Sequence, residues 1–227
     1  ANAYYEQGLD DQAIADYTKA ISLEPQGPDF LLADAYNYRG NAYERKGHYD
    51  EAIADFTMAI SLKPRSESIY ESRGNNYLRK ALYDLAIADF GKVISLNSRN
   101  VASYYNRALA YAHKGLYDEA IADLTKEISL APTDADAYDQ RGLAYAHKGL
   151  YDQAIADYSQ EIALNAKDIP LHPGFASLYA TAYSHRGVAY EHTGVINAAI
   201  ADYRASLKLD PNMRPAKDAL ARLGAGP

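Results

Sequence analysis

The chain has 227 residues and a formal net charge of -7, with 48% apolar and 23% charged residues. This balance is typical of a globular protein, and the acidic charge argues against nucleic acid as a partner, because nucleic-acid-binding surfaces are basic. The absence of cysteine excludes disulfides and thiolate metal sites, and no run of about 20 apolar residues is available for membrane insertion.

A four-residue string marks an internal repeat. The letters AIAD occur six times, and successive starts differ by 39, 34, 34, 34 and 45 residues. Three equal intervals indicate a unit of 34 residues, which insertions of 5 and 11 residues interrupt twice. The six strings begin at Ala13, Ala52, Ala86, Ala120, Ala154 and Ala199.

Taken in chain order, this register predicts one continuous domain of helical hairpins. Each full repeat holds two helix-length segments separated by a turn that usually contains glycine. The insertions 28–32 and 169–179 are expected to lengthen the helix that follows, because Pro28 and Pro173 suit a first helical turn. The predicted order is a partial repeat at 1–27, full repeats at 33–66, 67–100, 101–134, 135–168 and 180–213, and a capping helix within 214–227.

Tyrosine, glycine and proline recur at fixed places in the unit. Tyr36 and Tyr43 lie two helical turns apart on one face, with the small Gly40 between them, and Pro64 ends the repeat. In these features the chain resembles the tetratricopeptide repeat family over nearly its whole length, and the AIADY phrasing is similar to that of bacterial members. The resemblance implies an all-α fold, a right-handed superhelical solenoid of helical hairpins.

The resemblance also implies a function: a non-catalytic scaffold or adaptor that binds a peptide or a partner protein in its concave groove. Some family members clamp the C-terminal carboxylate of chaperones with lysine and asparagine. Only Asn106 resembles such an asparagine and no lysine occupies an inner site, so that mode is not expected here. The predicted groove residues are Tyr5, Asn37, Tyr38, Asn41, Arg45, Glu71, Asn75, Arg79, Tyr105, Asn106, His113, Asp139, Gln140, His147, His185 and His192.

Charged residues follow the same period. Every full repeat has Arg at position 7 and Asp at position 23, as at Arg73 and Asp89, which predicts an Arg–Asp ladder between hairpins. Asp50 and its equivalents at position 18 are predicted to cap the second helix.

Basic residues end the first helices, as at His113 and Lys114. They either complement the helix dipole or form a track for an acidic peptide. Histidines on successive hairpins, roughly 8–10 Å apart, are too distant to share one ion. We therefore expect neither a metal nor a cofactor.

Some residues depart from the repeat. Glu127 and Glu161 replace a semi-buried alanine and need a partner, for which the arginines are the nearest candidates. The apolar residues of the insertions, such as Phe30 and Phe175, either cover an edge of the stack or contact a partner.

Catalysis is not expected, because the chain has no nucleophile–base, P-loop or HExxH motif. The alternatives to a groove-binding scaffold are a self-assembling scaffold, associating through its incompletely covered N-terminal end, and the interaction module of a larger protein. No signal peptide is visible in the sequence, and both the cytoplasm and the periplasm stay open.

Overall fold

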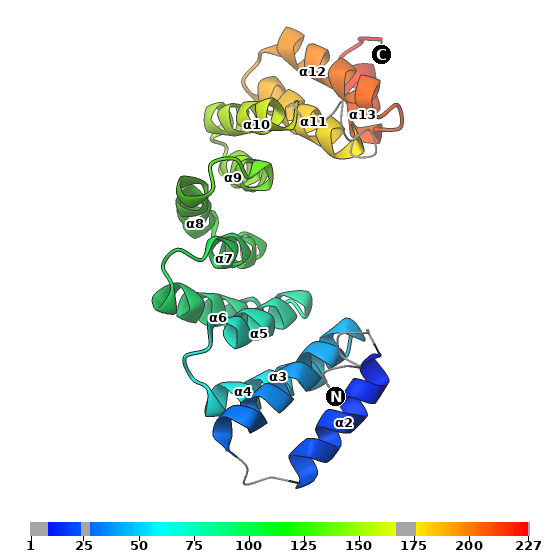
Figure 1. Cartoon of the computed structure of the whole chain (residues 1–227). Helices are drawn as coiled ribbons and strands as arrows, with labels where there is room; N and C mark the ends of the chain where they lie inside the picture. Colours follow the sequence, from blue (N-terminus) through cyan, green and yellow to red (C-terminus); the bar gives the residue numbers. More distant parts are fainter. Residues whose placement is uncertain (1–8, 24–27, 167–175, 227) are drawn as a thin grey trace. The chain divides into compact units, whose positions relative to one another are not determined.

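The computed structural model describes residues 9–23, 28–166 and 176–226. Within these ranges the regular elements are α-helices, and inside each of two units described below, helices that follow one another pack together (Figure 1). The chain divides into two compact units, Ala1–Lys114 and Gly115–Pro227, and each is described by itself. The single continuous domain and the repeat boundaries stay predictions.

The first unit holds three first helices of repeats and the second helices that pack on them. Its helices are α2 (Asp10–Leu23), α3 (Asp29–Arg45), α4 (Tyr49–Leu62), α5 (Glu67–Arg79), α6 (Tyr83–Leu96) and α7 (Val101–His113). Helix α3 begins directly after Pro28 and is 17 residues long, against 13 for α5.

The second unit begins with a second helix and ends on a short helix with a strongly one-sided apolar face. Its helices are α8 (Tyr117–Leu130), α9 (Ala135–His147), α10 (Tyr151–Asn165), α11 (Ala176–His192), α12 (Ile196–Leu209) and α13 (Arg214–Arg222). Ala216, Ala219 and Leu220 of α13 pack on Tyr203 of α12. Most of the predicted insertion 169–179 lies outside the described residues.

Close approach of the two helices in a hairpin depends on glycine. A β-carbon at Gly142 would lie 2.7 Å from Cε1 of Tyr158, and one at Gly74 would lie 2.9 Å from Cε1 of Phe90. The aromatic ring therefore fills the space that a larger residue at the glycine would need. In the hairpins α3–α4, α5–α6, α9–α10 and α11–α12, this contact holds the two helices together around a buried ring.

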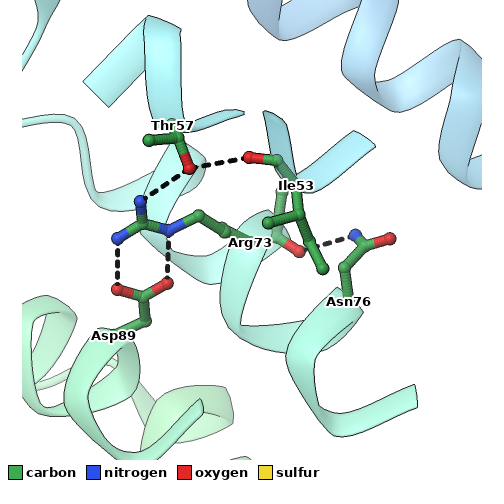
Figure 2. A network of polar contacts seen from close by, with 6 residues as sticks. Ile53, Thr57, Arg73, Asn76 and Asp89 are labelled. Carbon is green, nitrogen blue, oxygen red and sulfur yellow. Dashed lines mark hydrogen bonds and ion pairs between the residues drawn. The ribbon is translucent and has the colours of Figure 1, made fainter. Parts of the chain in front are cut away.

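Arginine joins both the helices of a hairpin and successive hairpins. Arg73 of α5 donates from Nε and Nη2 to the two Asp89 oxygens on α6, each at 2.8 Å, and from Nη1 to Oγ1 of Thr57 on α4 at 3.0 Å (Figure 2). The Thr57 hydroxyl in turn donates to the Ile53 carbonyl at 2.7 Å. The same bidentate pair occurs at Arg39–Asp55, Arg141–Asp157 and Arg186–Asp202.

Two sequence-based predictions need correction here. The Arg–Asp pairs lie within a hairpin and not between hairpins, because the two helices of one repeat face each other at these positions. The contact between hairpins runs instead from arginine to Thr or Ser. Asp50 lies in the first turn of α4, where its charge favours the helix dipole, but the N-cap residue is His48, and the Asp50 carboxylate accepts a hydrogen bond from Lys80 of the next hairpin.

Candidate functional site

The predicted groove residues that the structure describes in the first unit lie on three neighbouring first helices. Helix α5 contacts both α3 and α7. Asn106 of α7 donates from Nδ2 to Oδ1 of Asn75 on α5 at 3.2 Å, which brings two predicted residues together. Asn37 and Asn41 occupy α3 and are half-buried, as Asn75 and Asn106 are.

The predicted tyrosines differ in their surroundings. Tyr38 stacks on Tyr17 of α2, with ring centroids 5.8 Å apart and 16° between the planes, so one face of its ring is already packed. Tyr105 is half-buried on α7. Tyr5 lies outside the described residues.

A carboxylate lies at the α5 edge of this inner face. Burial raises the pKa of Glu71, and the charge of Glu67 raises it further, while a hydrogen bond with Asn100 acts in the opposite direction. Nearby, Glu44 Oε1 lies 4.0 Å from Nε of Arg79, a long contact between half-exposed side chains.

The basic residues that end the first helices all contact the preceding hairpin. Arg45 pairs with Asp10, and the Arg79 guanidinium lies 5.8 Å from the Tyr49 ring. The three histidines stack on tyrosines, as the pairs His113–Tyr83 at 5.0 Å, His147–Tyr117 at 4.8 Å and His192–Tyr151 at 4.2 Å. The lysines that follow pair with aspartates, as Lys46–Asp11, Lys80–Asp50, Lys114–Asp84 and Lys148–Asp118. These contacts give the basic stripe a stacking role, and the acidic-peptide track stays a prediction.

The second unit gathers acidic groups at the start of α9. Asp139 Oδ1 lies 3.0 Å from Nδ1 of His185 on α11, and Gln140 donates to Asp139 Oδ2 at 3.1 Å. Three predicted groove residues are thus in contact. Asp136, one turn earlier on α9, is exposed, and partial desolvation of its carboxyl, together with the charges of Asp134 and Asp139, raises its pKa.

Two buried carboxyls lie beside this acidic group. Glu127 is 0% exposed, and its carboxyl oxygens form no well-aligned hydrogen bond with a described residue, although the Asp134 carboxyl lies close enough for the two to share a proton. Burial, with the charges of Asp134 and Asp136, raises its pKa to about 7. Glu161 is 7% exposed, its Oε2 is likewise unpartnered within the described ranges, and burial with the charge of Asp139 raises its pKa to about 8.

The expected arginine partners of these carboxyls are elsewhere engaged. Arg141 lowers the pKa of Glu127 only in part, because its guanidinium forms the bidentate pair with Asp157. In the sequence, the positions of Glu127 and Glu161 stood out because glutamate replaces the alanine that some other repeats carry there. Their proximity to Asp134 and Asp136 depends on the stacking of α8, α9 and α10, which the sequence alone did not reveal.

No group of three or more His, Asp or Glu side chains within the described ranges has an arrangement that could hold a metal ion. None of the helices described is both long and apolar enough to cross a membrane.

These features define an all-α protein of stacked helical hairpins, a class of protein-interaction scaffold. Family models described as tetratricopeptide repeat match residues 33–66, 72–139, 135–168 and 180–213, and one described as TPR repeat matches residues 1–47. The chain belongs to the tetratricopeptide repeat family. Members of this family are generally non-catalytic interaction modules, and the predicted family and fold class are confirmed.

Solved structures share the fold. A crystal structure of MamA is 27% identical with a TM-score of 0.69, over 76% of this chain and 94% of that chain. MamA 41-end from Desulfovibrio magneticus RS-1 is 18% identical with a TM-score of 0.72, and the match covers 81% of this chain and 97% of that chain. YrrB, described as a TPR protein with an unusual peptide-binding site, is 22% identical with a TM-score of 0.73, and the match covers 90% of this chain and 97% of that chain. A search of curated proteins finds no match.

Proposed function

We propose that this protein is an adaptor that binds an extended segment of a partner protein on the inner face of α3, α5 and α7. The observation that carries the proposal is the hydrogen bond between Asn75 and Asn106, which joins polar side chains of two first helices on one half-exposed surface. The site belongs to the Ala1–Lys114 unit alone.

The chemistry of these amides suits a peptide main chain. A carboxamide carries the same N–H donor and carbonyl acceptor as a peptide group. After their mutual bond, Asn75 keeps its Nδ2 donors and Asn106 keeps its Oδ1 acceptor, since neither makes another side-chain hydrogen bond to a described residue. Together they offer a donor and an acceptor to one extended strand, independently of its side chains.

Tyr105 adds contact area beside the amides. It precedes Asn106 on α7 and is half-buried. Tyrosine is enriched at the energetically important centres of interfaces, because it buries a large ring at low entropic cost. Because Tyr38 already packs on Tyr17, we assign it a supporting role.

Peptide selection tests the proposal. A library of random linear peptides is panned on the immobilised protein, and the affinity of a selected peptide is measured by fluorescence anisotropy. Asn75→Ala with Asn106→Ala is expected to weaken binding at least tenfold, since each lost hydrogen bond is worth about 1 kcal/mol. Tyr105→Ala is expected to weaken it further.

The matched control changes two exposed residues on second helices of the same unit. Glu51→Gln with Lys92→Ala is expected to leave the affinity unchanged. Circular dichroism verifies that every variant keeps its helical content. The proposal is overturned if both double variants bind the selected peptide as tightly as the wild type does.

Self-association is a second candidate, which one observation favours. Phe30 and Leu31 at the start of α3 are 57% and 52% exposed, so the described residues leave much of their apolar surface uncovered. Light scattering over a dilution series tests it. A monomer at every concentration removes this candidate and leaves the groove proposal in place.

A further inference from the structure

We propose that the inner face of α9 in the Gly115–Pro227 unit binds a lysine or arginine side chain of the partner protein, between Asp136, Asp139 and Glu161. This inference deepens the proposed function and rests on it, because it assigns a chemical character to one residue of the bound partner. It concerns a different unit from the asparagine surface and is tested by different variants.

The placement of the three carboxyls is the first argument. Asp136 and Asp139 lie one helical turn apart on α9, the first exposed and the second half-buried. Helix α10 packs on α9 and carries Glu161. The charges of Asp139 and Asp136 both act on the Glu161 carboxyl, so the three carboxyls lie within electrostatic reach of one another.

The unpartnered oxygen of Glu161 is the second and independent argument. A buried polar atom normally has a hydrogen-bond partner, and leaving one unmade is costly. Oε2 of Glu161 has none among the described residues, although the residue is 7% exposed. A cation placed beside the aspartates would stabilise the ionised form of this shielded carboxyl, and an anionic or apolar group would not.

The local charges are the third argument. Helices α9 and α11 both pack on α10, which carries Glu161, and the cations of these helices are already engaged. Arg141 and Arg186 form bidentate pairs within their own hairpins, and the His185 ring contacts Asp139. The titratable and charged groups concerned are Asp136, Asp139 and Arg141 on α9, Asp157 and Tyr158 on α10, and His185 and Arg186 on α11.

A surplus of negative charge follows from this inventory. Asp136 has no salt bridge within the described part of the chain. Asp134 and the buried Glu127 add to the surplus at the same end of α9. Burial first, and then this excess of negative charge, raises the pKa of Asp136 and of Glu161. An arriving ammonium or guanidinium group would act in the opposite direction and lower both pKa values.

Proton release distinguishes this site from general attraction to an acidic protein. Near pH 7.5 Glu161, with its pKa raised to about 8, is largely protonated in the free protein. A bound cation lowers that pKa, so the carboxyl gives its proton to the buffer. The enthalpy of binding then depends on the buffer's own ionisation enthalpy, which attachment to exposed carboxylates would not cause.

The experiment is isothermal titration calorimetry of the full chain at low salt and pH 7.5. The probe is a synthetic linear peptide of glycine, serine and lysine, beside a matched peptide with glutamate in place of each lysine. The lysine peptide is expected to bind at least tenfold more tightly. Its enthalpy is expected to differ between phosphate and Tris buffers.

Three variants locate the site. Asp136→Asn with Asp139→Asn is expected to weaken binding of the lysine peptide at least tenfold. Glu161→Gln is expected to abolish most of the proton release while weakening binding less. The control Glu119→Gln with Asp218→Asn removes the same charge from exposed positions of this unit, and it is expected to change neither quantity.

Several results would overturn the inference. Equal losses of affinity for the lysine peptide in the control and in the aspartate variant would show non-specific attraction to an acidic protein. Proton release that is unchanged in Glu161→Gln would show that the peptide binds at another site. Proton release on titration with Ca²⁺ alone, lost in the aspartate variant, would indicate a metal site. If the lysine peptide does not bind but Asn75→Ala with Asn106→Ala still loses its selected peptide, this inference fails and the proposed function stands.

Discussion

Arg73 and Asp89 form a two-point ion pair that joins the two helices of one hairpin, with both N–O distances at 2.8 Å. The two side chains are only 15% and 6% exposed. Removing one partner leaves the other charge buried without compensation, so Arg73→Ala is expected to lower the free energy of unfolding by about 3–5 kcal/mol. Arg73→Lys is expected to recover only part of this loss, because lysine cannot form the bidentate contact. Urea denaturation followed by circular dichroism measures both.

The pair between Lys80 and Asp50 is the natural control for this prediction. Its side chains are 30% and 79% exposed, so solvent screens the attraction. Lys80→Ala is expected to cost less than about 1 kcal/mol. Equal losses for Arg73→Ala and Lys80→Ala would contradict the view that burial and geometry make the arginine pair important.

Gly91 interrupts the line of hydroxyl groups that link the arginines to the preceding hairpin. It occupies the place of Thr57 and Thr125, and a β-carbon there would lie 3.5 Å from Nη1 of Arg107, an ordinary contact distance. Gly91→Thr is expected to raise the free energy of unfolding, since helix propensity improves and a hydroxyl reaches the guanidinium. Gly91→Val provides the same shape without the hydroxyl. Threonine is expected to exceed valine by about 1 kcal/mol in urea denaturation, and equal stability would show that the hydroxyl contributes nothing.

The sequence predicted that arginine and aspartate pair, and it failed to predict which copies pair. Arg73–Asp89 within a hairpin and a pairing between hairpins have the same 34-residue period, so the period cannot distinguish them. Side-chain reach across a packed hairpin decides the question. The partner of Lys80 was not predictable either. The distance between Lys80 and Asp50 depends on how one hairpin stacks on the next, which the repeat period does not specify.

The candidate site was predictable to a similar degree. The repeat register placed Asn75 and Asn106 on first helices, and the structure adds the hydrogen bond between them. The repeat register also marked Glu161 as a departure from the alanine that some other repeats carry at this position. Whether Glu161 lies near Asp136 and Asp139 depends on how deeply each side chain is buried between the packed helices. Residue identity and sequence spacing do not specify that burial.

Gly142 sets the separation of α9 and α10. A β-carbon at this position would approach Cε1 of Tyr158 to 2.7 Å, closer than real side chains come, so Gly142→Ala must displace a fully buried ring. We expect a loss of about 1–3 kcal/mol in the free energy of unfolding. The repeat 101–134 carries alanine and leucine at the corresponding positions, Ala108 and Leu124.

That natural combination suggests the rescue experiment. Tyr158→Leu alone leaves a cavity and is expected to be destabilising, whereas Gly142→Ala with Tyr158→Leu is expected to be more stable than the sum of the two losses indicates. A double-mutant cycle in urea measures the coupling. Additive losses would mean that the contact between the two positions does not limit the helix separation.

Glu127 and Glu161 make the stability of the second unit depend on pH. Their pKa values in the folded protein, about 7 and about 8, lie above the ordinary value of 4.5. The unfolded chain therefore loses these protons at lower pH than the folded chain does, and stability falls as pH rises wherever the unfolded state binds fewer protons. The contribution of the protonated carboxyls is complete below about pH 4.5 and is lost as pH rises through about 7 and 8.

Alanine is the matched replacement, because Ala59 occupies the equivalent buried position in α4. Glu127→Ala with Glu161→Ala is expected to flatten the dependence of the free energy of unfolding on pH between about 5 and 8.5. Above pH 8 the variant is expected to be more stable than the wild type, by on the order of 3 kcal/mol. Urea denaturation at a series of pH values measures the slopes, with Glu119→Gln as the exposed control. Parallel slopes for wild type and the alanine variant would show that these carboxyls ionise normally, because a group with the same pKa in both states cannot link folding to pH.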